Sequence, residues 1–243
     1  MTSLLGLGML VMCAADAVVG VRLIALSLRT RELPEFALGN AVLLLGAVGY
    51  PLSVAARRGL GGDSGPEALL GWALAIQNLA SLAMAVATWR TFRPASRWGT
   101  AACAGLGAAL LASWCGQAFA SGFSLAPGGS AAYWLGYAAR ALPFFWNACE
   151  SWHYHGMLSR RLAIGLADPI VTDRFRLWAI SASGVCAAFA VFGLAALRGV
   201  DVATSPEVLA TSSLAGLVSG ATLWLAFLPP RRYLRRFEEA PAR

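Results

Sequence analysis

The stretch YWLGYAARALPFFWNACESWHYHGM, residues 133–157, is apolar enough to cross a bilayer and yet carries charged and polar side chains. A charged side chain at bilayer depth is costly, so it normally faces a bundle interior or a watery cavity and is paired there. At about 100° per residue, five members share roughly an 80° arc of one helix face: Arg140, Pro143, Asn147, Glu150 and Tyr154. The stretch therefore predicts a membrane helix with one polar face turned into a bundle.

The rest of the chain is similarly apolar. Its 243 residues are 58% hydrophobic and 13% charged, with a mean hydropathy of +0.64, which is too apolar for an ordinary soluble domain. Seven apolar runs are long enough for the ~30 Å hydrocarbon core: 4–26, 36–55, 68–89, 99–120, 131–157, 177–197 and 207–228. We expect an all-α, polytopic integral membrane protein with a single seven-helix transmembrane domain over 1–230 and a basic cytoplasmic tail over 231–243.

The distribution of arginine predicts the orientation of these runs. Cytoplasmic loops retain positive charge. With the N-terminus outside, fourteen arginines fall in cytoplasmic segments and three in outer ones. This predicts an outer N-terminus and a cytoplasmic C-terminus in the plasma (inner) membrane. It also accounts for the net charge of +7 without a nucleic-acid partner.

Several interior polar residues are candidates for a ligand or ion site: Asp16, Arg22, Gln77, Asn78, Arg140, Asn147, Glu150 and His153. At 1.5 Å per residue, Arg22 and Glu150 lie at similar depths, whereas Arg140 lies nearer to the level of Asp16. We therefore predict that Glu150 pairs with Arg22, and that Arg140 pairs with Asp16 or its neighbours. Each pair would clamp the first helix to the fifth. Such groups either fix helix packing or form a site for a ligand, an ion or a proton.

The sequence contains no complete set of residues that would bind a retinal, zinc or haem cofactor. The chain has no lysine, so a retinal Schiff base is excluded. Glu150 and His153 form an ExxH unit, but the two histidines lie on one helix and complete neither a zinc site nor a bis-histidine haem site. The five cysteines form no CxxC motif. We expect no cofactor and no metal, and the missing catalytic set favours a protein that is not an enzyme.

Partners are predicted mainly for the cytoplasmic side and the bilayer. Residues 158–176 form the longest link, and Asp168-Pro169 is a good helix start within it. This elbow is either a simple capped connection or a docking surface for a cytoplasmic partner. The GxxxG pattern at 216–220 fits packing within the chain or a homo-oligomer. We expect the basic tail to rest on anionic lipid.

The function that these features favour is a seven-helix sensor or receptor-like module. A small molecule, lipid or proton would meet the interior polar site, and the elbow would report the change. A small-solute carrier or channel that uses the same site is the alternative, and so is a non-catalytic subunit of a membrane complex.

Overall fold

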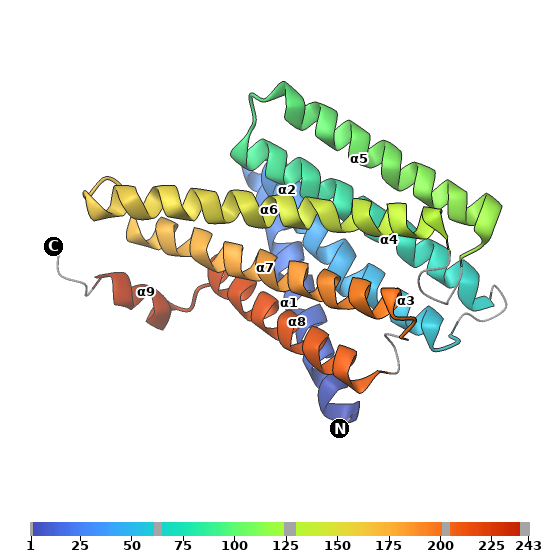
Figure 1. The fold of residues 1–243 in the computed structure, drawn as a ribbon. Coiled ribbons are helices and arrows are strands. Elements are labelled where there is room, and N and C mark those ends of the chain that lie inside the picture. The colour runs from blue at the N-terminus through green and yellow to red at the C-terminus, as the bar shows by residue number, and fades with distance from the viewer. Residues whose placement is uncertain (1, 61–64, 124–129, 201–204, 239–243) are drawn as a thin grey trace.

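The computed structural model describes residues 2–60, 65–123, 130–200 and 205–238, and all regular structure in these segments is helical (Figure 1). The α-helices and π-helices (η) follow one another along the chain: α1 (Thr2–Thr30), α2 (Leu33–Val42), η1 (Leu43–Gly49), α3 (Tyr50–Arg57), α4 (Gly65–Phe92), α5 (Arg97–Gly116), η3 (Gln117–Ser121), α6 (Ala131–Ala163), α7 (Pro169–Leu197), α8 (Pro206–Phe227) and α9 (Arg231–Glu238). Residues 239–243 of the expected tail lie outside the described residues.

Six helical segments are long and apolar enough to cross a membrane: Leu10–Thr30, Leu33–Arg57, Gly65–Phe92, Arg97–Phe119, Pro169–Leu197 and Pro206–Phe227. They coincide with six of the seven predicted runs, so the all-helical prediction is confirmed and the chain has the character of a multi-pass membrane protein. The remaining run, 131–157, forms α6, which has 33 residues but a more polar composition.

Helices α2, η1 and α3 form one continuous helix, Leu33–Arg57. We call each long continuous helix of the structure a rod, and this is the second rod. Pro51 stands near the start of α3. Proline lacks an amide hydrogen and its ring crowds the carbonyl four residues earlier. The wider π turn of Leu43–Gly49 comes directly before it and relieves this conflict without breaking the rod.

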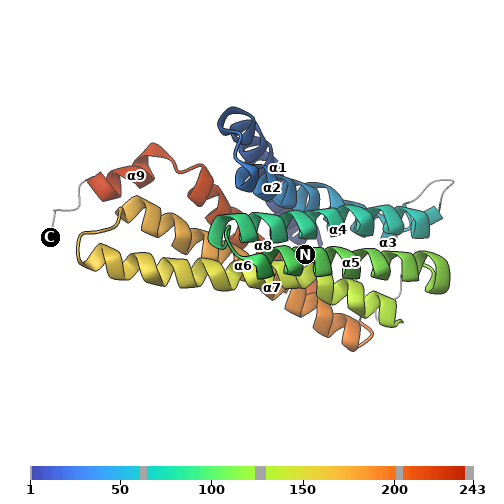
Figure 2. The same ribbon diagram turned by 90° about the horizontal axis from the view of Figure 1, so that it is seen from above.

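The long helices form a ring of six rods. In the order α1, Leu33–Arg57, α4, α6, α7 and α8, each rod contacts the next, and α8 returns to α1. Helix α5 packs outside this ring against α4 and α6, at the edge of the bundle in Figure 1. Figure 2 shows α9 beside the end at which α6 and α7 are joined. In this order of six rods, α6 is three places from α1 in either direction, so α1 and α6 are opposite one another in the ring.

The largest apolar core cluster draws on all six rods of the ring: Val19, Leu23, Ala37, Leu38, Ala41, Met84, Ala87, Phe144, Ala148, Ala182, Cys186 and Leu223. Large apolar side chains are also exposed on the outside of the bundle, among them Trp72, Leu111 and Phe119 at 69%, 64% and 85% exposure. A surface of this kind suits contact with lipid tails, which are as apolar as the side chains themselves.

Glycines bring α1 close to both of its neighbours. A Cβ on Gly20 would lie 2.9 Å from the carbonyl oxygen of Gly39, and a Cβ on Gly39 would lie 2.9 Å from that of Gly20. The GxxxG pattern packs within the chain, since a Cβ on Gly220 would lie 3.5 Å from that of Ala15 and Gly216 faces Met12. Small residues thus set the distance between the backbones.

We expect Gly39→Ala to lower the free energy of unfolding by about 1–3 kcal/mol, because the added methyl group meets backbone atoms that have no room to move. The measurement is the unfolding midpoint of the purified protein in detergent. Gly105→Ala is the matched control, since a Cβ there would meet nothing within 4 Å. Equal midpoints for both variants would contradict the close contact of α1 with α2.

Candidate functional site

The polar face of α6 is buried, as its sequence predicts. Arg140, Asn147 and Glu150 are 4%, 1% and 8% exposed, and Pro143 on the same face is fully buried. Polar side chains at this depth need partners, because an unpaired polar group in an apolar interior costs free energy.

Helix α4 supplies those partners along a row of contacts that we call the polar seam. The Arg140 Nη1 donates to Asn78 Oδ1 at 3.2 Å, and Asn147 Nδ2 donates to Thr88 Oγ1 at 3.0 Å. Ser81 Oγ donates to the backbone oxygen of Arg140 at 3.2 Å. Bonded residues differ in number by 59 or 62 here, a nearly constant offset that follows from the parallel course of the two helices.

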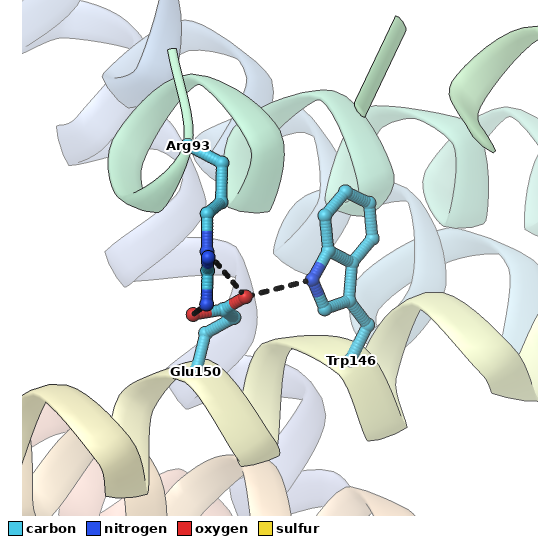
Figure 3. Close-up of polar contacts among 3 residues, drawn as sticks. All are labelled: Arg93, Trp146 and Glu150. Atoms are coloured by element: carbon cyan, nitrogen blue, oxygen red, sulfur yellow. Dashed lines mark hydrogen bonds and ion pairs between the residues drawn. The ribbon is translucent and has the colours of Figure 1, made fainter. Parts of the chain in front are cut away.

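The last contact of the polar seam is an ion pair between Arg93 and Glu150 (Figure 3). Arg93 Nε lies 3.0 Å from Glu150 Oε1 and Nη2 lies 3.3 Å from Oε2, so the pair is bidentate. Trp146 Nε1 also donates to Oε1 at 3.3 Å. The predicted pair of Glu150 with Arg22 is therefore wrong. Arg22 is exposed on α1, a rod that has no seam with α6.

The predicted ion pair of Arg140 with Asp16 is also absent from the described part of the chain. The hydrogen-bond partner of the Arg140 guanidinium is the neutral side chain of Asn78. The prediction used only the depth of each residue along its helix. Asp16 and Arg140 do line the same cavity. Depth carried no information about their direction around the ring, and α1 and α6 stand on opposite sides.

A cavity of about 250 Å³ lies inside the ring. All six rods contribute to its wall, and none of its lining residues comes from α5. Four of the predicted site residues line it: Asp16, Gln77, Arg140 and Asn147. The wall is otherwise mostly apolar and aromatic, which is typical of sites for small molecules, and a few polar groups would set the orientation of a ligand.

Asp16 lies against the π turn of the second rod. A Cβ on Gly46 would overlap the Asp16 carboxylate, so only glycine leaves room for this side chain. In the described segments of the chain, Asp16 makes no hydrogen bond or ion pair with another residue. One turn further along the rod, the backbone oxygen of Gly49 accepts a hydrogen bond from Gln77 Nε2 at 3.0 Å. The carboxylate therefore faces the cavity without a protein partner.

The two ends of the cavity differ. At one end the lining reaches Arg58, an exposed residue directly after α3, and Tyr133 near the start of α6; we call this the open end. At the other end the lining reaches Trp178. That ring belongs to an aromatic cluster whose contacting centroids lie 4.7–6.0 Å apart: Phe92, Tyr154, Phe175, Trp178 and Phe227. We call this the aromatic end.

The remaining predicted site residues lie away from the cavity. Asn78 and Glu150 belong to the polar seam, whereas Arg22 and His153 are exposed. The His155 ring lies 3.1 Å from the backbone oxygen of Thr172. Within residues that the structure describes, no group of three or more His, Cys, Asp or Glu side chains is arranged to hold a metal ion.

Some lining residues were not predicted from the sequence. Tyr137 donates a hydrogen bond from its hydroxyl to the backbone oxygen of Phe189, and the hydroxyls of Ser181 and Ser219 lie 3.1 Å apart. Serine and tyrosine are common in membrane helices, so their type alone gives no signal. Gly46 does give a signal in the sequence: it stands at the same depth as Asp16, and a glycine there leaves room for the Asp16 side chain.

The elbow and the tail meet at the aromatic end. Asp168 caps α7 as predicted, with its carboxylate accepting from the amides of Ile170 and Val171. Asp173, which is buried, pairs with Arg176 at 2.5 Å and accepts a hydrogen bond from the Tyr233 hydroxyl of α9. The tail helix is thus attached to the start of α7.

We expect a double-mutant cycle to couple Glu150 to Arg93 and not to Arg22. Replacing Glu150 or Arg93 with Gln should each lower the free energy of unfolding, with a coupling of about 1 kcal/mol, because one partner is half-exposed and the other buried. The matched cycle of Glu150 with Arg22→Gln should give a coupling near zero. Folding free energies in detergent micelles measure both, and coupling only to Arg22 would refute the observed pair.

Comparison of the chain with protein-family models, with curated proteins and with solved structures found no match. The cavity and the polar seam are therefore the features on which a function can rest.

Proposed function

We propose that the chain is a seven-helix receptor-like protein of the plasma (inner) membrane that binds a small molecule in the cavity of the ring. Its N-terminus is outside and its C-terminus is cytoplasmic, because most arginines then lie on the cytoplasmic side. Helix α6 is the seventh span. Its position in the ring between α4 and α7 supports this, since the polar seam hides the groups that would otherwise meet lipid.

The observation that carries the proposal is a mostly apolar cavity with an acidic and a basic side chain on its wall, neither of which has a partner of opposite charge among the described residues. Asp16 has no protein partner among the described residues, and Arg140 has a neutral one. Keeping such groups in an apolar interior costs several kcal/mol per ion. A bound molecule that contacts them recovers part of this cost, which gives the cavity affinity for a ligand.

The two different ends favour a receptor over a channel. In the proposed orientation the open end, with Arg58 and Tyr133, faces outside. The aromatic end faces the cytoplasm, and the rings that contact Trp178 pack at that end of the cavity. A ligand would enter from one side and leave by the same side.

The aromatic end also provides a route by which binding could be reported. Trp178 lines the cavity and stacks on Phe175 of the elbow at 5.8 Å. Phe175 lies two residues from Asp173, to which Tyr233 of α9 is attached. A ligand that moves Trp178 would change the cytoplasmic surface around residues 158–176, where we expect a partner to dock.

A carrier is the second candidate. Aromatic side chains pack at the aromatic end, and Tyr50 and Phe192 stack at 5.9 Å near the open end. The cavity therefore has an aromatic contact towards each side. Alternating opening of two such contacts is how a carrier would work. Flux across the membrane separates this candidate from a receptor.

The proposal is tested with Ala188→Trp, which fills the cavity, and with Ala187→Trp as its matched control, since Ala187 is exposed on the outside of α7. Small molecules that copurify with the protein are identified by mass spectrometry. We expect wild type and Ala187→Trp to retain the same molecule and Ala188→Trp to lose it. The recovered molecule should then raise the unfolding temperature of wild type without crossing the membrane of proteoliposomes.

Other results identify the alternatives. Flux of the recovered molecule that Ala188→Trp abolishes would establish a carrier. Copurification of a fixed protein partner, with the same small-molecule content in all three proteins, would overturn the proposal in favour of a structural subunit.

We expect Tyr233→Phe to release the tail helix from α7, because the phenyl ring has no hydroxyl to donate to Asp173. Burial, together with the hydrogen bond to Asp173, raises the pKa of Tyr233 above its ordinary value of 10.0. The attachment is therefore complete below pH 10 and is lost as the pH rises through the raised pKa. A nitroxide on Arg235→Cys should gain mobility in Tyr233→Phe at neutral pH and in wild type only at high pH. Tyr154→Phe is the control, and equal mobility in all variants would contradict the attachment.

A further inference from the structure

We infer that the ligand of the cavity is a small zwitterion with an apolar body, whose ammonium group binds Asp16 and whose carboxylate binds Arg140. This inference rests on the proposed function, since it names the chemical class of molecule that the same cavity accepts. It follows from the signs, the positions and the surroundings of the two charged groups.

The two charges share one cavity but stand on opposite rods. Neighbouring helix axes lie about 8–10 Å apart, so opposite axes in a ring of six lie on the order of 16–20 Å apart. The Arg140 guanidinium is also turned sideways to Asn78 on α4. Asp16 and Arg140 accordingly form no ion pair, and the cavity that both of them line leaves space for a molecule between them.

A chain of contacts fixes the relative depth of the two groups. Asp16 lies against Gly46, and Gly49 lies three residues further along that rod against Gln77. The next residue of α4, Asn78, bonds to Arg140. Three residues along the second rod lead about 4.5 Å towards the open end, and the step from Gln77 to Asn78 on the antiparallel α4 leads about 1.5 Å back. The guanidinium is therefore roughly 3 Å nearer to the open end than the carboxylate. A ligand that reaches both groups lies obliquely across the cavity.

A zwitterion matches this arrangement better than an ion of either sign. A cation bound to Asp16 would leave Arg140 without an opposite charge, and an anion bound to Arg140 would leave Asp16 unpaired. The other charged lining residues are Arg57 and Arg58 at the open end, where positive charge favours entry with the carboxylate turned towards Arg140.

The walls between the charged groups suit an apolar body. Phe144 and Phe189 contact each other with centroids 5.5 Å apart, and both line the cavity together with Trp178. Tyr50 lies four residues, about one turn, beyond Gly46 and places an aromatic ring on the side of the cavity that holds Asp16. Aromatic faces attract ammonium groups as well as apolar ones. The volume of about 250 Å³ limits the ligand to a small molecule.

The test uses five probes with the same phenyl body on the full-length protein in lipid nanodiscs. Three are zwitterions whose ammonium and carboxylate are separated by one, two and three carbons: L-phenylalanine, β-phenylalanine and 4-amino-3-phenylbutyrate. Phenethylamine carries only the ammonium and 3-phenylpropionate only the carboxylate. Calorimetric titration gives the affinities. We expect at least one zwitterion to bind on the order of 10–100-fold more tightly than both singly charged probes, because a second charge-assisted contact is added.

Two variants assign the ends of the ligand. Asp16→Asn should weaken the best zwitterion on the order of 10–100-fold and leave 3-phenylpropionate unchanged, and Arg140→Gln should do the converse with phenethylamine. Glu67→Gln and Arg22→Gln are the matched controls, since both residues are exposed and line no part of the cavity. Both controls should bind every probe as wild type does.

The outcomes separate the ligand class from the function. Singly charged probes that bind as tightly as the zwitterions, with binding abolished by Ala188→Trp, would overturn the zwitterion but leave a ligand-binding cavity. Absence of binding by all five probes overturns the zwitterion class in this size range. The proposed function then fails as well only if Ala188→Trp also retains the same copurified molecules as wild type.

Discussion

The polar seam joins α4 to α6 through hydrogen bonds and an ion pair along most of the shared length of the two helices. Helix α6 carries an arginine, an asparagine and a glutamate on one face, and no arrangement in lipid is tolerable unless another helix satisfies that face. Helix α4 does so with Asn78, Ser81 and Thr88 along its length and Arg93 at its end. Because the contacts repeat with a nearly constant offset, they fix the register of the two parallel helices as well as their proximity.

The ring and its cavity follow from that register. With α4 and α6 held together, α5, which connects them, is left outside the ring. The remaining rods close the circle through glycine contacts, such as that of Gly20 with Gly39, which carry little directional information of their own. The seam also explains why Arg140 is at the wall of the cavity: its neutral partner Asn78 holds the guanidinium in place without neutralising its charge.

Much of this fold could be predicted from the sequence, whereas its neighbour relations could not. The length of the apolar runs predicts the helices, and angular spacing predicts the buried face of α6. Four of the eight predicted site residues line one cavity: Asp16, Gln77, Arg140 and Asn147. Depth says nothing about direction around a bundle, so both predicted ion pairs joined rods that stand opposite. The pairing of Arg93 with Glu150 has no local signal in the sequence, because the two residues lie 57 positions apart.

Asp16 and Arg140 line the same cavity without forming an ion pair, so no direct contact between these two side chains links the opposite sides of the ring. The seam and the glycine contacts link each rod to its neighbours, but Asp16 and Arg140 belong to rods on opposite sides. A ligand that contacts both would add a connection across the ring, which the protein alone does not make. Its binding free energy would favour the conformation in which α1 and α6 are closest. Since α6 continues through Tyr154 into the aromatic cluster, a change of this kind would reach the elbow and the attached tail helix.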